Sequence, residues 1–236
     1  MSSRFDYYDA IAHLIPGAIG CLVILYFCDV FSVTLPRPRV GSLGGLGIGV
    51  AVAYTVGHLL QSLASAFEPM YYFVWGGKPS VRLLEKRSDR FSEEQRRDLV
   101  HAFVKFFDML EPCPQGKNVR RNYYQRVFEK CMGVCNRNKL GRVETFVTIY
   151  GFHRVLLTTF LLAFAGCAFT RAAIGLGALL LPSEKLRVLN FMTWMAGASA
   201  LIEVFRARQR AYHYAHEVIM MTSDFIRSSG SASSPM

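Results

Sequence analysis

Acidic residues, histidines and catalytic signature motifs are scarce in this sequence, and their scarcity excludes several classes of protein. The 236 residues include only 6 His, mostly isolated, whereas membrane oxygenases hold two metal ions with clustered histidines. The chain lacks a Gly-x-Ser-x-Gly nucleophile elbow, a phosphate-binding P-loop and a His-Glu-x-x-His zinc motif. Its 6 Cys form no Cys-x-x-Cys pair. The sequence therefore predicts no metal and no cofactor, and it favours a protein that is not an enzyme.

Apolar residues, in contrast, make up 52% of the chain and gather in four long blocks. A helix needs about 20 mainly apolar residues to cross the hydrocarbon core of a membrane. The blocks are His13–Phe31, Leu43–Phe67, Thr148–Phe169 and Leu186–Phe205. The first follows acidic residues and no small-residue cleavage site comes after it, so we expect a retained helix and not a signal peptide. The sequence predicts an all-α membrane protein with four transmembrane helices.

Positive charge is unevenly divided among the segments that flank these blocks. Of the 27 Lys and Arg, 22 lie in the N-terminal segment, the loop between the second and third blocks, the start of the third block or the C-terminal tail. The other 5 lie in the two remaining connections. Cytoplasmic segments near membrane spans are enriched in Lys and Arg. We therefore predict a bacterial inner-membrane protein whose two termini and long loop are cytoplasmic.

The long loop and the tail are both predicted to be folded. Ser92 and Gln95 have the spacing of a helix-capping box, and apolar residues recur at helical spacing after them. A second helix is expected from about 118 to 136, and a third begins near Arg142 and runs unbroken into the third span. An apolar stripe beyond Phe205 predicts that the fourth helix extends into the cytoplasm.

These predictions divide the chain into five parts. They are a transmembrane hairpin (1–67), a basic helical cytoplasmic domain (68–147), a second transmembrane hairpin (148–205), a cytoplasmic helix (206–227) and a Ser-rich disordered tail (228–236). The helices of the cytoplasmic domain are expected to bury their apolar stripes against one another or against another subunit.

Small residues recur at every fourth position of the second span. They are Gly41, Gly45, Gly49, Ala53 and Gly57. Residues four apart share one helix face, and a face of small side chains lets another backbone approach closely in lipid. Two interpretations remain open: this face packs on another span of the same chain, or it forms an interface between subunits or lines a pore.

Polar residues collect where the second span ends and the third begins. We expect His58, Gln61, His153 and Arg154 to form a polar cluster at the inner mouth of the membrane part. Polar groups at membrane depth usually face protein or water. Asp29 and Glu203 lie near span ends and are expected to reach lipid headgroups.

A stretch of the cytoplasmic loop alternates cations with aromatic side chains. Its members are Arg120, Arg121, Tyr123, Tyr124 and Arg126. Cations near a membrane attract anionic lipid, which is one interpretation of the basic loop. The other is that this stretch contacts RNA, a nucleotide signal or a nucleoprotein.

Two pairs of residues resemble the Arg-x4–6-His signature of the HEPN helical ribonucleases. They are Arg96 with His101, and Arg208 with His213, the latter having the polar residue Gln209 after its Arg. The resemblance implies that such sites meet at a dimer interface, where Arg and His act on the RNA phosphate and 2′-hydroxyl. A membrane-anchored ribonuclease is therefore an alternative function.

Two short patches resemble small membrane proteins of bacterial antiphage-defence loci, including the accessory membrane proteins of type VI-B CRISPR systems. One is Phe5-Asp6-x-x-Asp9 with the His13–Gly17 segment, and the other is Tyr150-Gly151-Phe152-x-Arg154. The resemblance implies an effector that oligomerises and permeabilises or depolarises the inner membrane when an infection signal reaches its cytoplasmic part. A passive scaffold or a small transporter is a further alternative.

Overall fold

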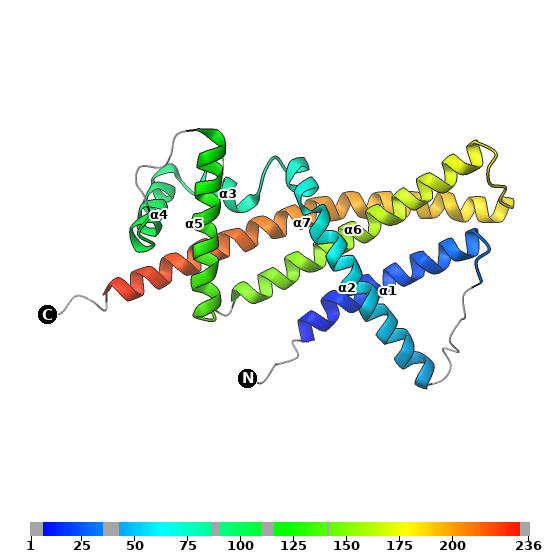
Figure 1. Cartoon of the computed structure of the whole chain (residues 1–236), viewed down its shortest axis with the longest axis horizontal. Helices are drawn as coiled ribbons and strands as arrows, with labels where there is room; N and C mark the ends of the chain where they lie inside the picture. The colour runs from blue at the N-terminus through cyan, green and yellow to red at the C-terminus, as the bar shows by residue number, and fades with distance from the viewer. Residues whose placement is uncertain (1–6, 35–42, 86–89, 110–115, 141, 232–236) are drawn as a thin grey trace. The chain divides into compact units, whose positions relative to one another are not determined.

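The computed structural model consists of α-helices and describes residues 7–34, 43–85, 90–109, 116–140 and 142–231, in which it contains no strand. Figure 1 draws the helices, coloured from the N-terminus to the C-terminus. Their bounds are α1 (Tyr7–Val30), α2 (Leu43–Val74), α3 (Pro79–Leu84), α4 (Glu93–Phe106), α5 (Lys117–Arg137), α6 (Arg142–Gly175) and α7 (Ser183–Ser231). The all-helical class predicted from the sequence is confirmed.

Four of these helices are long and apolar enough to cross a membrane. They are α1, α2, α6 and α7, which contain the four apolar blocks of the sequence. As predicted, α6 runs unbroken from Arg142, and α7 continues past Phe205. Because α7 ends at Ser231, the predicted start of the disordered tail at 228 is wrong by four residues, and 232–236 lie outside the described residues.

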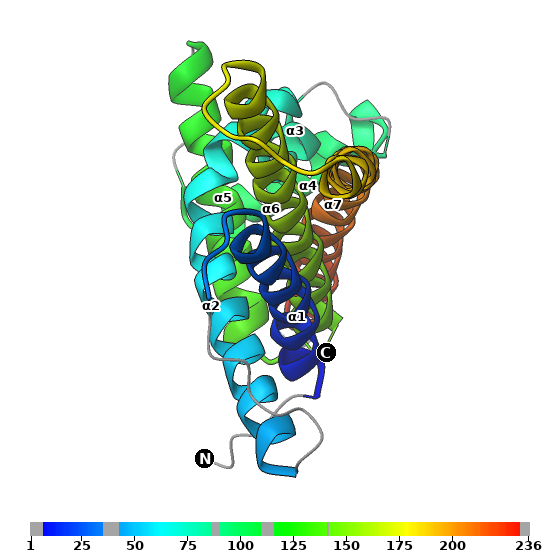
Figure 2. The same cartoon turned by 90° about the vertical axis from the view of Figure 1, so that its right-hand side faces the viewer.

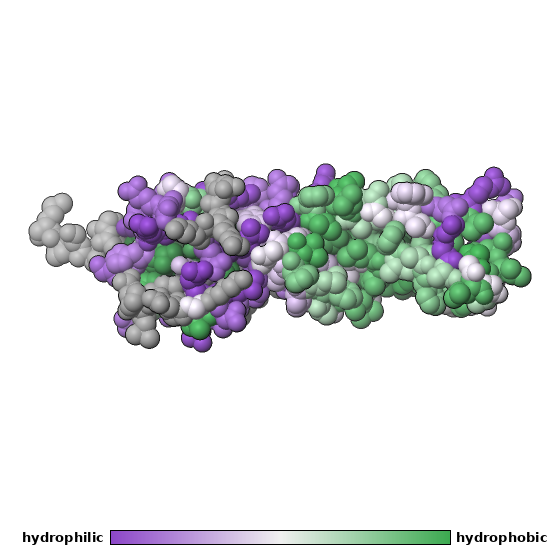
Figure 3. Space-filling model, turned by 90° about the horizontal axis from the view of Figure 1, so that it is seen from above, coloured by the Kyte–Doolittle hydropathy of each residue, from purple (hydrophilic) through white to green (hydrophobic). Residues whose placement is uncertain are grey.

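The chain forms two compact units, which share α2, α6 and α7 as continuous helices. We call residues 1–68 and 148–207 the apolar unit, and residues 69–147 and 208–236 the basic unit. The basic unit contains 19 of the 27 Lys and Arg but 11 of the 17 Asp and Glu, a net charge of +8. On the face drawn in Figure 3, the surface of the apolar unit is mainly hydrophobic and that of the basic unit mainly hydrophilic.

In the apolar unit, α1 and α2 cross at two glycines, one from each helix (Figures 1 and 2). A Cβ added at Gly17 would lie 1.8 Å from the carbonyl oxygen of Ala53, and one added at Gly57 would lie 2.1 Å from that of His13. Real Cβ atoms do not come this close to a backbone, so both positions require glycine for the observed crossing. Close approach of backbones at small residues is the usual basis of helix association in lipid.

The basic unit has its own hydrophobic core. Its most buried side chains include Phe103 of α4, Val127 of α5 and Ile219 of α7, each 0% exposed. The apolar stripe predicted for the extension of the fourth helix is therefore buried against the loop helices. The predicted capping box starts α4: the Ser92 hydroxyl accepts from the Gln95 amide at 3.1 Å, and the Gln95 side chain accepts from the Ser92 amide at 3.1 Å.

Candidate functional sites: a buried charged cluster and a basic pocket

Arg154, near the start of the apolar part of α6, is buried and is the centre of a cluster of ionisable side chains that also includes the half-buried Glu68. Its Nη1 lies 3.0 Å from Glu68 Oε1 of α2, and its Nη2 donates to Ser65 Oγ at 3.2 Å. The Tyr150 hydroxyl donates to the same Glu68 oxygen at 3.0 Å, and the guanidinium stacks over the Tyr150 ring at 5.4 Å from its centroid. The ion pair thus joins α2 to α6.

A second pair, which is buried, lies one residue away and joins α6 to α7. His153 Nδ1 lies 2.8 Å from Glu203 Oε2, and the two residues are 8% and 7% exposed. Thr158 and Thr159 follow on α6, are buried, and donate to the carbonyls of Arg154 and Val155. We call His153, Arg154, Glu68, Glu203 and their hydrogen-bonded neighbours Ser65 and Tyr150 the charged cluster.

The position of this cluster along α6 and α7 can be compared with the thickness of a hydrocarbon core. Seventeen residues separate Arg154 from Arg171 near the far end of α6, or about 25 Å at 1.5 Å per residue. Sixteen residues separate Glu203 from Arg187 on α7, or about 24 Å. If α6 and α7 cross a hydrocarbon core about 30 Å thick, these separations place the ionisable groups of the cluster near one of its boundaries.

The predicted polar inner mouth is divided by the structure into two groups. His153 and Arg154 join the charged cluster, whereas His58 is exposed and stacks on His13 of α1, with 4.2 Å between ring centroids. Gln61 is half-buried and lies near Gly151 of α6, since a Cβ added at Gly151 would be 3.9 Å from Gln61 Nε2. The expectation that Glu203 reaches headgroups is wrong, because its carboxylate is buried on His153.

The small-residue face of α2 is also divided. Ala53 and Gly57 are buried against α1 of the same chain, which is the first of the two interpretations. Gly49 is exposed, and a Cβ added there would meet nothing within 4 Å. Gly45 is buried, and Gly41 lies outside the described residues.

The residues that resemble a ribonuclease signature have other partners in this fold. The Arg208 guanidinium lies over the Tyr212 ring at 5.9 Å from its centroid, and His213 Nδ1 lies 3.4 Å from Arg90 Nη1. Arg96 is buried in the basic unit, whereas His101 is exposed. Arg96 and His101 thus differ in burial, and the contacts of Arg208 and His213 are with Tyr212 and Arg90.

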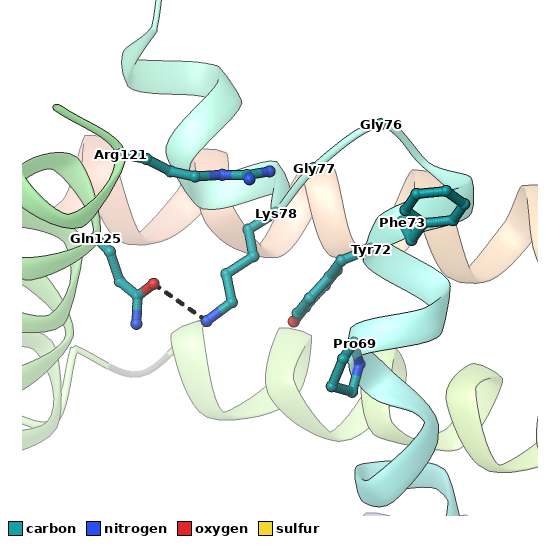
Figure 4. A pocket seen from close by; sticks show the side chains of 8 residues that line it. All are labelled: Pro69, Tyr72, Phe73, Gly76, Gly77, Lys78, Arg121 and Gln125. Atoms are coloured by element: carbon teal, nitrogen blue, oxygen red, sulfur yellow. Dashed lines mark hydrogen bonds between the residues drawn. The ribbon is translucent and has the colours of Figure 1, made fainter. Parts of the chain in front are cut away.

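The residues of the alternating basic and aromatic stretch lie on different faces of α5, because the stretch is helical, and they differ in burial. Tyr123 is 8% exposed in the core, with Tyr124 packed against it, and Arg126 is exposed. Arg120 lies 3.9 Å from Glu85, at the protein surface. Arg121 lines a pocket of about 570 Å³, drawn in Figure 4. The stretch is therefore not one continuous contact surface.

This basic pocket was not predicted as a unit. Its lining comes from the end of α2, the turn after it and α5: Pro69, Tyr72, Phe73, Gly76, Gly77, Lys78, Arg121 and Gln125. Arg121 was a candidate from the sequence, but Lys78 was not. The only sequence signal for the turn is the Gly-Gly-Lys-Pro run that ends α2.

The cysteines of α5 belong to the core of the basic unit. Cys131 and Cys135 are 0% and 1% exposed, and the Sγ of Cys135 lies 3.4 Å from the Thr222 hydroxyl of α7. Burial raises the pKa of the Cys131 thiol to about 12, because the thiolate would lose its hydration. Within the described ranges no group of three His, Cys, Asp or Glu side chains could hold a metal ion.

The fold and these sites define an all-helical protein with four helices suited to cross a membrane, which indicates a multi-pass membrane protein. No protein-family model, curated protein or solved structure matches the chain.

Proposed function

We propose that this protein is a signal-responsive effector of the bacterial inner membrane that oligomerises and permeabilises the membrane. The carrying observation is the charged cluster, since ionisable side chains within membrane helices are costly and usually functional. The short patches that resemble membrane proteins of antiphage-defence loci support a role in defence. The proposed orientation has both termini and the basic unit in the cytoplasm, supported by the excess of Lys and Arg there.

In this proposal the charged cluster holds a polar path closed. Its two pairs tie α6 to α2 and to α7, and each carboxylate lies within hydrogen-bond distance of a nitrogen on the neighbouring helix. Among the described residues, the Nε of Arg154 is buried and has no acceptor, so the closed cluster leaves one donor unsatisfied. Separating the helices would let water hydrate these groups, which offsets part of the cost of opening.

The signal would reach the cluster through continuous helices. Both α6 and α7 belong to the two units, as does α2. A ligand that binds the basic unit better in one arrangement than in another shifts the helices by as much as that difference in affinity allows. In this proposal the basic unit binds the signal, and the charged cluster is the element that changes between a closed and an open arrangement.

Oligomerisation is assigned to the exposed part of the small-residue face of α2. Gly49 has open space around it, so a second copy can approach there, whereas Gly57 is already used within the chain. We expect Gly49→Leu to reduce the oligomer without unfolding the protomer. Native mass spectrometry of the detergent-solubilised chain checks this, and an unchanged oligomer distribution would exclude Gly49 from the interface.

The function is tested by following the membrane potential of bacteria with a voltage-sensitive dye during induced expression. We expect the full chain to depolarise the cells and the Arg208→Ala/His213→Ala variant to depolarise them equally. Total RNA is analysed from the same cultures. An unchanged potential together with RNA cleavage that requires Arg208 and His213 would overturn the proposal in favour of a ribonuclease.

The orientation has its own test. A fluorescent protein that matures only in the cytoplasm is fused to the C-terminus, and we expect bright cells. A dark fusion at normal protein levels would contradict the cytoplasmic assignment of the basic unit.

A further inference from the structure

The basic pocket gathers positive charge without a matching carboxylate. In the part of the chain that the structure describes, its lining contains the two cations Lys78 and Arg121 and no acidic residue. The pocket lies wholly within the basic unit. Figure 4 shows Arg121 extending from α5 towards the turn, and Lys78 extending from the turn towards Gln125 of α5. A volume of about 570 Å³ is within the range of small-ligand sites.

Lys78 is held at this pocket by uncharged groups. Its Nζ donates to Gln125 Oε1 at 3.3 Å and lies 5.7 Å from the centroid of the Tyr72 ring. The Gln125 amide is oriented by Glu129, because its Nε2 donates to that carboxylate at 2.8 Å and its oxygen is left for Lys78. The ammonium has three donors, so further donors remain for an anion.

The end of the Arg121 side chain lies close to the turn that carries Lys78: a Cβ added at Gly77 would lie 2.9 Å from Arg121 Nη2. The φ of Gly77 is 130°, a conformation that residues with a Cβ rarely adopt, so the turn requires glycine at this position. Arg82 fixes the same turn by donating from Nη1 to the Trp75 carbonyl at 2.7 Å. On α5, Arg121 and Gln125 are four residues apart and share a face, which brings both cations to one pocket.

We propose that the basic pocket binds a phosphate group. Guanidinium and ammonium groups are the usual protein partners of phosphate, and here both are present and lack an ion-pair partner in the described residues. The phosphate has two sources to be distinguished: the headgroup of an anionic phospholipid, or a free nucleotide. Phe73 and Val74, 87% and 65% exposed at the end of the apolar helix α2, offer an adjacent surface for acyl chains.

The test uses the purified full chain in a non-ionic detergent and does not depend on membrane permeabilisation. Phosphatidylglycerol in micelles, phosphatidylcholine in micelles and ADP are titrated separately. The readout is the fluorescence of Trp75, isolated by Trp194→Phe, since these are the 2 Trp of the chain and Trp75 precedes the glycine turn. Circular dichroism confirms that each variant keeps its helices.

Two double variants that remove equal charge separate a pocket from general attraction. Lys78→Gln/Arg121→Gln empties the pocket of cations, whereas Arg120→Gln/Arg126→Gln removes two exposed cations of α5 outside it. We expect the first to weaken binding at least about tenfold, because hydrogen bonds to charged groups are among the stronger ones. We expect the second to change binding by less than about threefold.

The outcomes separate the two sources and the failure of the proposal. Saturable binding of phosphatidylglycerol but not of ADP or phosphatidylcholine identifies an anionic lipid headgroup. Saturable binding of ADP identifies a free phosphate compound. Two results would overturn the proposal that the basic pocket binds phosphate. One is equal weakening of binding by both double variants, and the other is no saturable binding of phosphatidylglycerol or of ADP.

Discussion

The charged cluster of the apolar unit and the basic pocket of the basic unit differ in how their ionisable side chains are paired. In the cluster, Arg154 lies about 3 Å from Glu68 and His153 lies 2.8 Å from Glu203; three of these residues are buried and Glu68 is half-buried. In the basic unit, Arg97 and Glu93 form a pair at 3.0 Å with side chains 75% and 50% exposed, and Lys78 and Arg121 are offered to a pocket. A charged side chain that is buried away from water needs a partner to remain ionised, whereas a hydrated charged side chain does not and can bind a ligand.

The largest loss of stability is expected from a substitution at the close crossing of α1 and α2 in the apolar unit. Gly57→Leu places a side chain into the backbone of α1, since even a Cβ would lie 2.1 Å from the carbonyl oxygen of His13. We expect the folded protomer to be lost, seen as aggregation in size-exclusion chromatography and a collapsed thermal transition. Gly49→Leu is the matched control, because its Cβ meets nothing within 4 Å. Equal yields of folded protomer from the two variants would refute the observed α1–α2 crossing.

The next effect compares a partly buried ion pair with an exposed one. Glu68→Ala leaves the buried Arg154 guanidinium without its half-buried carboxylate, and we expect a loss of about 2–3 kcal/mol in the free energy of unfolding, between the costs at exposed and at buried pairs. Glu93→Ala breaks the exposed pair with Arg97 and should cost about 0.5 kcal/mol. Denaturation of both variants in the same detergent provides the comparison. A similar cost for both would remove the distinction between the units.

A smaller effect is expected from alkaline pH on the basic unit. The pKa of Cys131 rises from 9.0 to about 12 in the fold, so the folded state keeps a proton that the unfolded chain releases above pH 9. The contribution of this thiol to stability is therefore full below pH 9 and falls as the pH rises towards 12, by about 1–2 kcal/mol between pH 8 and pH 10.

The measurement is urea denaturation at both pH values, with Cys131→Ala as the reference that lacks this contribution. The same protonation predicts slow alkylation of native Cys131 at pH 8, because the thiolate is the reactive form. A wild-type loss no larger than that of Cys131→Ala, or rapid native alkylation, would show that the thiol is not buried as described.

The smallest effect is expected at the start of α4. Ser92→Ala removes the acceptor for the Gln95 amide at 3.1 Å and should cost about 1 kcal/mol, the usual value of an N-cap. Ser92→Thr keeps the hydroxyl and should retain most of the stability. Thermal unfolding of the two variants decides whether the capping box contributes in solution.

The sequence allowed the helices to be predicted but not the partners of their charged side chains. Long apolar runs identify spans, and the Ser92–Gln95 spacing identifies a helix start, because both signals are local. The pairing of Glu68 with Arg154, in contrast, depends on the rotation of α2 against α6, which no local pattern fixes. For the same reason Glu203 was expected at headgroups and is instead bonded to His153.

The shortest element was also missed for a physical reason. Residues Pro79–Leu84 form α3, which at six residues is too short to show an apolar period. The basic pocket depends on this region, because its cations come from the turn before α3 and from α5, which are adjacent only in the fold. Arg121 was recognisable as a candidate from its aromatic neighbours, but those neighbours are largely core residues.

The most direct test of the proposed closed cluster is ion flux from proteoliposomes that contain the purified full chain. Glu203→Gln removes the charge that holds His153, and Glu184→Gln removes an exposed carboxylate of the same helix as a matched control. Folding of both variants is verified by size-exclusion chromatography before reconstitution. We expect potassium release from the Glu203→Gln vesicles to exceed that from the wild type and from Glu184→Gln. Equal release from all three, with all three folded, would contradict a cluster that closes a path through the membrane.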